Sequence, residues 1–166
     1  PNAHYNNTAQ EIIDDFGDKL DMIVVSVGTG GTITGVAKKL KETIKKIKII
    51  GVDPIGSILG GGNKISSYLV EGSGYDFFPE VLDNSLIDEY VKTEDEESFL
   101  MARRLIKEEG LLCGGSCGAT MVGTLKAAKI LGENKNCLAI LADGIRNYMT
   151  KFPNDQWMKE NGFSIK

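Results

Sequence analysis

Apolar residues along the chain predict strands that alternate with helices. Residues 22–27 ("MIVVSV") and 47–53 ("IKIIGVD") are mostly apolar and rich in β-branched residues, which is typical of buried β-strands. Four apolar residues between these runs share one face of a helix: Ile33, Val36, Ala37 and Leu40. A strand, a helix and a second strand in this order indicate a βαβ unit, in which the two strands are parallel.

Capping patterns predict two further helices. Each pattern is a threonine followed three residues later by a glutamate, as in a capping box. The two boxes pair Thr8 with Glu11 and Thr93 with Glu96. They predict a short helix over 9–16 that stops at Gly17, and an amphipathic helix over 95–109 that stops at Gly110.

The remainder of the chain continues the alternation. Residues 86–93 predict a short strand, 136–144 a further buried strand, and the tail an amphipathic helical segment. Between those strands, "LLCGGSCGATMVGTLKAAKIL" (111–131) contains an apolar stretch, a glycine turn and a long helix. The fold class we expect is therefore α/β, an open, mostly parallel sheet with helices on both faces. We expect residues 1–166 to form a single domain.

Charge and cysteine content exclude several classes of function. The net charge is −4, which does not indicate a surface for nucleic acid or anionic membranes. No apolar run reaches the ~20 residues that a membrane span needs. The three cysteines, Cys113, Cys117 and Cys137, contain no C-x-x-C pair, which favours a reducing, cytoplasmic setting and no metal site. We interpret Cys113 and Cys117 as packing residues and His4 as a hydrogen-bonding residue.

The glycine loop "SVGTGGTITG" (26–35) leaves the first strand and opens the following helix. The first turn of a helix has unpaired N–H groups and carries the positive end of the helix dipole. Gly28, Gly30 and Gly31 allow a ligand to approach the backbone, and Thr29 and Thr32 add hydroxyl donors. A tight turn alone needs fewer such residues, so we predict that the loop binds a dianionic phosphate.

A dinucleotide-binding loop is an alternative. Asp53 ends the next strand, where an acid that binds ribose would lie. However, Ile33 occupies the position of the third glycine of that fingerprint, and the following Pro54 makes Asp53 equally typical of a turn. A nicotinamide-dependent dehydrogenase is therefore less favoured, and NADH binding would test it.

The second glycine turn, "CGGSCGAT" (113–120), places Ser116 where a helix N-cap is expected. We expect both glycine turns to follow parallel strands, whose carboxyl ends are where open α/β sheets bind ligands. Ser116 is thus either a capping residue or a group that faces the same ligand as the first loop. The spacing alone leaves both interpretations open.

Six stretches resemble the cystathionine β-synthase branch of the fold type II pyridoxal-phosphate enzymes. They follow the family's order over nearly the whole chain: "NAHY" (2–5), "KLDMIVVSVGTGGTITG" (19–35), "IIGVDPIGSIL" (49–59), "VEGSGYDFFPEVLD" (70–83), "EEGLLCGGSCG" (108–118) and "RNYMTKF" (146–152). The glycine loop is common to the wider group that includes cysteine synthase. The fourth and sixth stretches are more specific to the cystathionine synthases.

The resemblance implies a cofactor, pyridoxal 5′-phosphate, and a role for each matching residue. The cofactor phosphate would be held by Gly28, Thr29, Gly30, Gly31 and Thr32. Ser116 would hydrogen-bond the pyridine nitrogen. The substrate side of the pocket would be lined by Gly72, Gly74 and Tyr75. Haem is not supported by this chain, because the haem-binding segment of the family lies outside the matching stretches.

The activity that the resemblance implies is the condensation of serine with homocysteine to give cystathionine, with hydrogen sulfide production as a side activity. It also implies a homodimer. The family forms its Schiff base through a lysine in an S-x-K motif near the N-terminus, and residues 1–27 contain no such motif. We therefore expect the lysine and most of the small domain to lie upstream of Pro1, and we assign no catalytic residue to this chain.

Two other interpretations stay open. Cysteine synthase shares the glycine loop but uses an activated serine and sulfide, so a comparison of homocysteine with sulfide as acceptor separates the two enzymes. A binding or regulatory module without the lysine is the other, although the glycine loop and Ser116 together favour an enzyme. The residues encoded upstream of Pro1 would decide between them.

Overall fold

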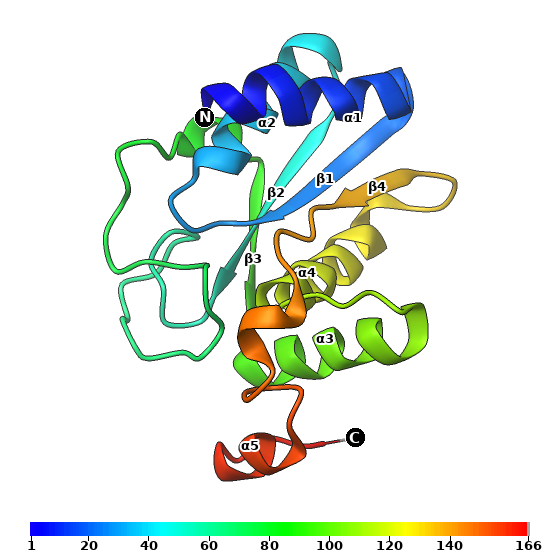
Figure 1. Cartoon of the computed structure of the whole chain (residues 1–166). Coiled ribbons are helices and arrows are strands. Elements are labelled where there is room, and N and C mark those ends of the chain that lie inside the picture. The colour runs from blue at the N-terminus through cyan, green and yellow to red at the C-terminus, as the bar shows by residue number, and fades with distance from the viewer. Residues whose placement is uncertain (166) are drawn as a thin grey trace.

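The computed structural model describes residues 1–165 and contains a parallel sheet with the strand order β3–β2–β1–β4 (Figure 1). The strands are β1 (Leu20–Ser26), β2 (Lys48–Pro54), β3 (Glu89–Thr93) and β4 (Asn136–Ala139). In the register, Val24 of β1 lies opposite Ile50 of β2 and Ala139 of β4. The three pairings are all parallel, which confirms the expected open α/β sheet.

Helices cover both faces of this sheet. The longer helices are α1 (Ala9–Phe16), α2 (Gly31–Thr43), α3 (Asp95–Glu109), α4 (Gly115–Leu131) and α5 (Asp155–Glu160). The short helical turns are η1 (His4–Thr8), η2 (Gly17–Lys19), η3 (Asn84–Leu86) and η4 (Ile145–Tyr148). Figure 1 shows α1 and α2 on one face of the sheet and α3 and α4 on the other.

Alternation along β1 divides the core into two parts. Ile23 and Val25 point into the core beneath α1 and α2, whereas Met22 and Val24 point toward α3 and α4. The face of α2 predicted from the sequence is buried in the first core: Ile33, Val36, Ala37 and Leu40. The predicted βαβ unit is confirmed by the parallel pairing of β1 with β2.

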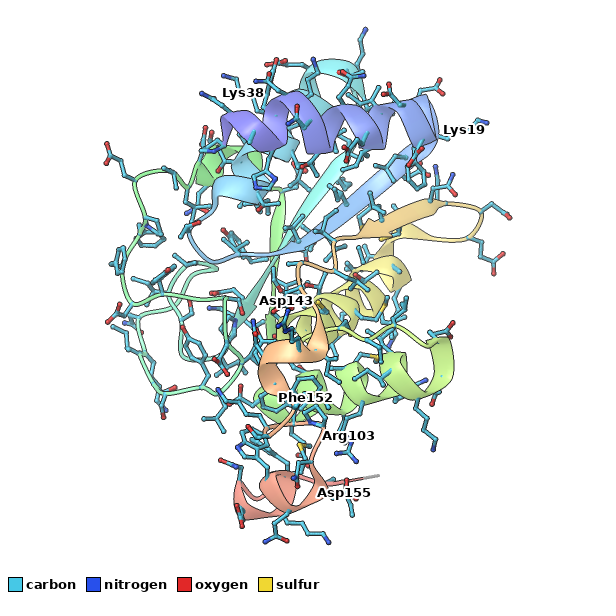
Figure 2. All side chains as sticks on the ribbon, in the orientation of Figure 1. Lys19, Lys38, Arg103, Asp143, Phe152 and Asp155 are labelled. Carbon is cyan, nitrogen blue, oxygen red and sulfur yellow. The ribbon has the colours of Figure 1, made fainter. Side chains whose placement is uncertain are left out.

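An aromatic cluster joins the C-terminal segment to α3. The ring of Phe99 stacks on Phe152 at 5.6 Å and meets Trp157 edge-on at 5.4 Å. Arg103 of α3 donates to the Phe152 carbonyl at 3.0 Å and pairs with Asp155, and Figure 2 shows these three side chains between α3 and α5. The helical tail predicted from the sequence is thus limited to η4 and the short α5.

Both capping boxes predicted from the sequence are wrong. Thr8 has helical backbone angles because η1 runs directly into α1, and its hydroxyl bonds His4 instead of an amide of α1. The second box exists one residue later, with Glu94 at the N-cap and Glu97 at the third helical position. A glutamate side chain thus takes the place that the pattern gives to threonine.

Two strand predictions also need correction. The stretch before the second glycine turn forms only an isolated antiparallel bridge between Cys113 and Gly144 and does not join the parallel sheet. The predicted strand over 136–144 ends at Ala139 and is half-buried, since β4 pairs with β1 alone at the edge of the sheet.

Replacing Gly118 by alanine is expected to destabilise the protein by about 1–3 kcal/mol, the usual cost of overpacking. A Cβ at this position would lie 2.0 Å from the Ser98 carbonyl oxygen and 2.7 Å from the Ala102 amide nitrogen, so α3 and α4 would have to separate. The midpoint of urea unfolding measures the loss. Gly144→Ala is the control, because its Cβ would meet nothing closer than 3.4 Å. Equal midpoints for the two variants would contradict this account.

Candidate active site

The glycine loop places bare amide groups at the start of α2. Gly30 has φ of +85° and is the N-cap, and α2 begins at Gly31. Within residues 1–165, no amide of residues 28–32 donates a hydrogen bond to the protein. Thr29 is exposed and Gly28, Gly31 and Thr32 are partly exposed, so the loop is open to solvent. Unpaired donors at a helix N-terminus fit a phosphate dianion.

The loop at 70–82 lies directly against the bare amides of residues 28–32, which we call the cradle. A Cβ on Gly28 would lie 2.7 Å from the Gly72 carbonyl oxygen, and the Gly74 amide donates to the Val27 carbonyl at 2.8 Å. A Cβ on Gly30 would lie 2.6 Å from Leu82. The structure therefore brings Gly72 and Gly74, two residues predicted from the sequence, beside the predicted phosphate loop.

Tyr75 is only partly available to such a site. Its ring packs against the core beneath α2 and lies 4.9 Å from the ring of Phe77. Ser57 fixes its backbone, because the Ser57 hydroxyl accepts from the Tyr75 amide at 2.9 Å and donates to its carbonyl at 3.0 Å. Ser73, between the two glycines, is buried and its hydroxyl has no partner within the described residues. Neither serine was predicted from the sequence.

His4 connects the cradle to the N-terminal helix. Thr32 Oγ1 lies 3.2 Å from His4 Nε2, and His4 Nδ1 lies 3.1 Å from Thr8 Oγ1. The N-terminal segment lies so close to α2 that a Cβ on Gly35 would lie 2.2 Å from the Pro1 carbonyl oxygen. The hydrogen-bonding role that the sequence suggested for His4 is confirmed.

Ser116 lies within the first turn of α4. The N-cap is Gly114, so Ser116 is the second residue of the helix and the expected N-cap position is wrong. Ser116 is buried, and within the described residues its hydroxyl has no hydrogen-bond partner. The hydroxyl is therefore free for a ligand rather than used in a cap.

Asp143 holds the turn before Ser116. Its carbonyl accepts from the Gly114 amide at 3.3 Å, and its carboxylate accepts from the Tyr148 hydroxyl at 2.6 Å. Figure 2 places Asp143 close to the start of α4. The Cys117 thiol donates to the Asp143 carbonyl at 3.4 Å, and the neighbouring Cys113 thiol lowers the pKa of Cys117 against the opposing effect of burial. Both thiols are buried, as expected of packing residues.

The two glycine turns meet through side chains that the sequence analysis overlooked. Ser26, the last residue of β1, lies within 3.2 Å of the Ser116 carbonyl and 2.8 Å from the Thr120 hydroxyl. A polar residue within the apolar run "MIVVSV" was the signal that could have revealed Ser26. Thr120 carried no such signal, since its partner is 94 residues away in the sequence.

Asp53 is occupied by protein groups rather than placed to bind ribose. Its carboxylate, fully buried, accepts from Lys92 at 2.5 Å and from the Gly60 amide at 2.8 Å. Burial, and then the charge of Asp53, raise the pKa of Tyr90. The dinucleotide alternative therefore loses the acid on which it depended.

Other kinds of site are not found in the described part of the chain. Among residues 1–165, no group of three or more His, Cys, Asp or Glu side chains is arranged to hold a metal ion. Across the same residues, no helix has the length and apolar character required to cross a membrane.

Comparisons with known proteins show the family to which the chain is similar. The family model described as "Pyridoxal-phosphate dependent enzyme" matches residues 1–143. Cystathionine β-synthase of Dictyostelium discoideum is 56% identical over 98% of this chain and 34% of that protein. The mouse (Mus musculus) cystathionine β-synthase is 54% identical over 98% of this chain and 30% of that protein. The chain thus spans about a third of the length of these curated relatives.

A solved structure shows the same similarity to cystathionine β-synthases. An O-acetylserine-dependent cystathionine β-synthase from Helicobacter pylori superposes with a TM-score of 0.86 and 42% identity, covering 91% of this chain and 49% of that one. The predicted fold type II architecture is therefore confirmed. Taken with the match over residues 1–143, these results show that the chain belongs to the family of pyridoxal-phosphate-dependent enzymes.

Proposed function

We propose that this chain forms the cofactor-binding half of an enzyme that carries out β-replacement on a serine-type amino acid. Residues 28–32 hold the cofactor phosphate and Ser116 contacts the pyridine nitrogen. Residues 1–166 form most of the large domain, and a lysine outside the chain completes the site. The enzyme is a homodimer, a proposal that rests on the family resemblance. It is cytoplasmic, a proposal that the free thiols of Cys113, Cys117 and Cys137 support.

The observation that carries the proposal is the contact between the two glycine turns. Ser26 lies two residues before Gly28 and hydrogen-bonds the Ser116 carbonyl, so the bare amides and the free Ser116 hydroxyl lie at the same edge of the sheet. Gly72 lies against Gly28 and supplies the neighbouring backbone for the substrate side. These features support one site rather than two separate turns.

Ser116 favours replacement chemistry over transamination. The bound cofactor withdraws electrons from the substrate α-carbon. A carboxylate opposite the pyridine nitrogen would keep that nitrogen protonated, whereas the neutral hydroxyl of Ser116 does not enforce protonation. With less electron density drawn into the ring, loss of the substrate β-substituent and addition of a thiol are favoured.

Serine and homocysteine are the substrates that we propose, with cystathionine as the product. The names of the Dictyostelium and mouse relatives support this choice. The Helicobacter pylori structure is described as O-acetylserine dependent, which favours an activated serine as a second candidate. Assays of the full-length protein with each donor, serine or O-acetylserine, against each acceptor, homocysteine or sulfide, separate the two. Absence of cofactor from that protein would contradict both.

Ser116→Ala is expected to weaken pyridoxal-phosphate binding about 2–10-fold, the range of one neutral hydrogen bond, and to shift the absorption maximum of the bound cofactor. Ser116→Asp should instead raise the proportion of transamination, measured as conversion of the cofactor to its amine form. Ser67→Ala, at an exposed loop position, is the control that should leave the spectrum unchanged. An unshifted spectrum in Ser116→Ala would contradict the assigned contact.

A further inference from the structure

We propose that Ser26 and Thr120 are positioning residues, which set the distance between the phosphate end and the pyridine end of the cofactor site. This inference rests on the function proposed above, because it takes Ser116 as the pyridine contact. The two hydroxyls connect the last residue of β1 to the first turn of α4, and so connect the two glycine turns.

The connection is a closed triangle of hydrogen bonds. Thr120 Oγ1 donates to the Ser116 carbonyl at 2.9 Å. Ser26 Oγ lies 2.8 Å from Thr120 Oγ1 and 3.2 Å from the Ser116 carbonyl. Because Thr120 has given its one proton to the carbonyl, Ser26 donates its own proton to these two acceptors. The Ser116 backbone is therefore held from two sides.

Loss of these hydrogen bonds would affect both ends of the proposed cofactor site. Thr120 and Ser116 are both buried, so an unmade bond there leaves a group without water to replace its partner. Gly28 follows Ser26 after a single residue, and the Ser116 hydroxyl belongs to the residue whose carbonyl is held. A shift of α4 relative to β1 would move the pyridine contact away from the phosphate cradle.

Thr124 provides an internal comparison. Its hydroxyl donates to the Thr120 carbonyl at 2.7 Å, a bond of the same kind one turn further along α4. Such bonds from a threonine to the carbonyl four residues earlier are common in helices and need no ligand. In the described residues Thr124 has no strand hydroxyl as a partner, whereas Thr120 has Ser26. The link to β1 is therefore what distinguishes Thr120.

The test uses the full-length holoenzyme with pyridoxal phosphate as the probe. Ser26→Ala and Thr120→Val should each weaken cofactor binding by no more than Ser116→Ala does, within the same range of about 2–10-fold for one lost hydrogen bond, and should shift the absorption maximum in the direction seen for Ser116→Ala. Thr120→Ser keeps the hydroxyl and should bind within about twofold of the parent protein. Thr124→Val is the matched control and should leave both the dissociation constant and the spectrum unchanged.

A double variant tests whether the effect passes through Ser116. In a Ser116→Ala background, Ser26→Ala should weaken binding less than about twofold, because the positioned hydroxyl is already gone. Full additivity would overturn the proposal, as would a Ser26→Ala protein that unfolds at a lower temperature but binds and absorbs like the parent. If Ser26→Ala does not fold, Thr120→Val against Thr124→Val decides the question. Failure of Ser116→Ala to change the spectrum would instead overturn the function proposed above.

Discussion

Replacing Gly30 by alanine should reduce the affinity of the full-length protein for pyridoxal phosphate more than about 100-fold. Gly30 has φ of +85°, a conformation that costs an L-residue about 1–2 kcal/mol. Its new Cβ would also lie 2.6 Å from Leu82 Cβ and 2.8 Å from Leu82 Cα, closer than any relaxed contact. Relief of both problems requires the loop to rotate, which turns the amide groups of residues 28–32 away from the phosphate.

Two further glycines separate the cradle effect from general strain. A Cβ on Gly31 would meet nothing closer than 3.8 Å, so Gly31→Ala should weaken binding far less than Gly30→Ala. Gly110 has φ of +71° at the end of α3, outside the site, and Gly110→Ala should lower stability without changing cofactor affinity. Titration of the apoprotein with pyridoxal phosphate gives the three dissociation constants. A loss of affinity in Gly110→Ala as large as that in Gly30→Ala would mean that backbone strain, and not the position of the loop amides, is responsible.

The first half of the fold was predictable because its signals are local. The apolar run of β1, the helical spacing of α2 and the glycines between them are contiguous in the sequence, and each element has the periodicity of its structure. The same locality made the glycine loop recognisable as a candidate site. The strand predicted before the second turn is wrong because Cys113 pairs only with Gly144, and a local apolar stretch does not reveal which distant residue it will pair with.

Long-range side-chain contacts account for most of what the sequence did not reveal. Asp53 has the local signature of a turn, yet its partner Lys92 comes from the neighbouring strand β3, and the pairing depends on the strand order. The Thr8 capping box is wrong for a related reason. The residues before Thr8 are already helical, so Thr8 has helical backbone angles, and its hydroxyl hydrogen-bonds His4 instead of a backbone amide. Spacing rules consider one element at a time and do not include such competing partners.

Lys92→Met should destabilise the protein by about 3–5 kcal/mol, the usual cost of leaving a buried charge without its partner. The Asp53 carboxylate has no solvent exposure, and within residues 1–165 its Oδ1 already lacks a hydrogen bond. Loss of the Lys92 ammonium would leave the charge with the Gly60 amide alone, and would also remove the bond from Lys92 to the Ser57 carbonyl at 2.7 Å. The free energy of unfolding in urea measures the effect.

A matched control and a rescue variant test whether the unpaired charge is the cause. Lys135 pairs with Asp21 at 2.9 Å on the surface, so Lys135→Met makes the same substitution at an exposed pair and should change stability little. Asp53→Asn combined with Lys92→Met removes the unpaired charge but keeps an oxygen for the Gly60 amide, and it should be more stable than Lys92→Met alone. A double variant as unstable as Lys92→Met would assign the loss to the packing of the Lys92 side chain, because the buried charge would then be absent and the instability would remain.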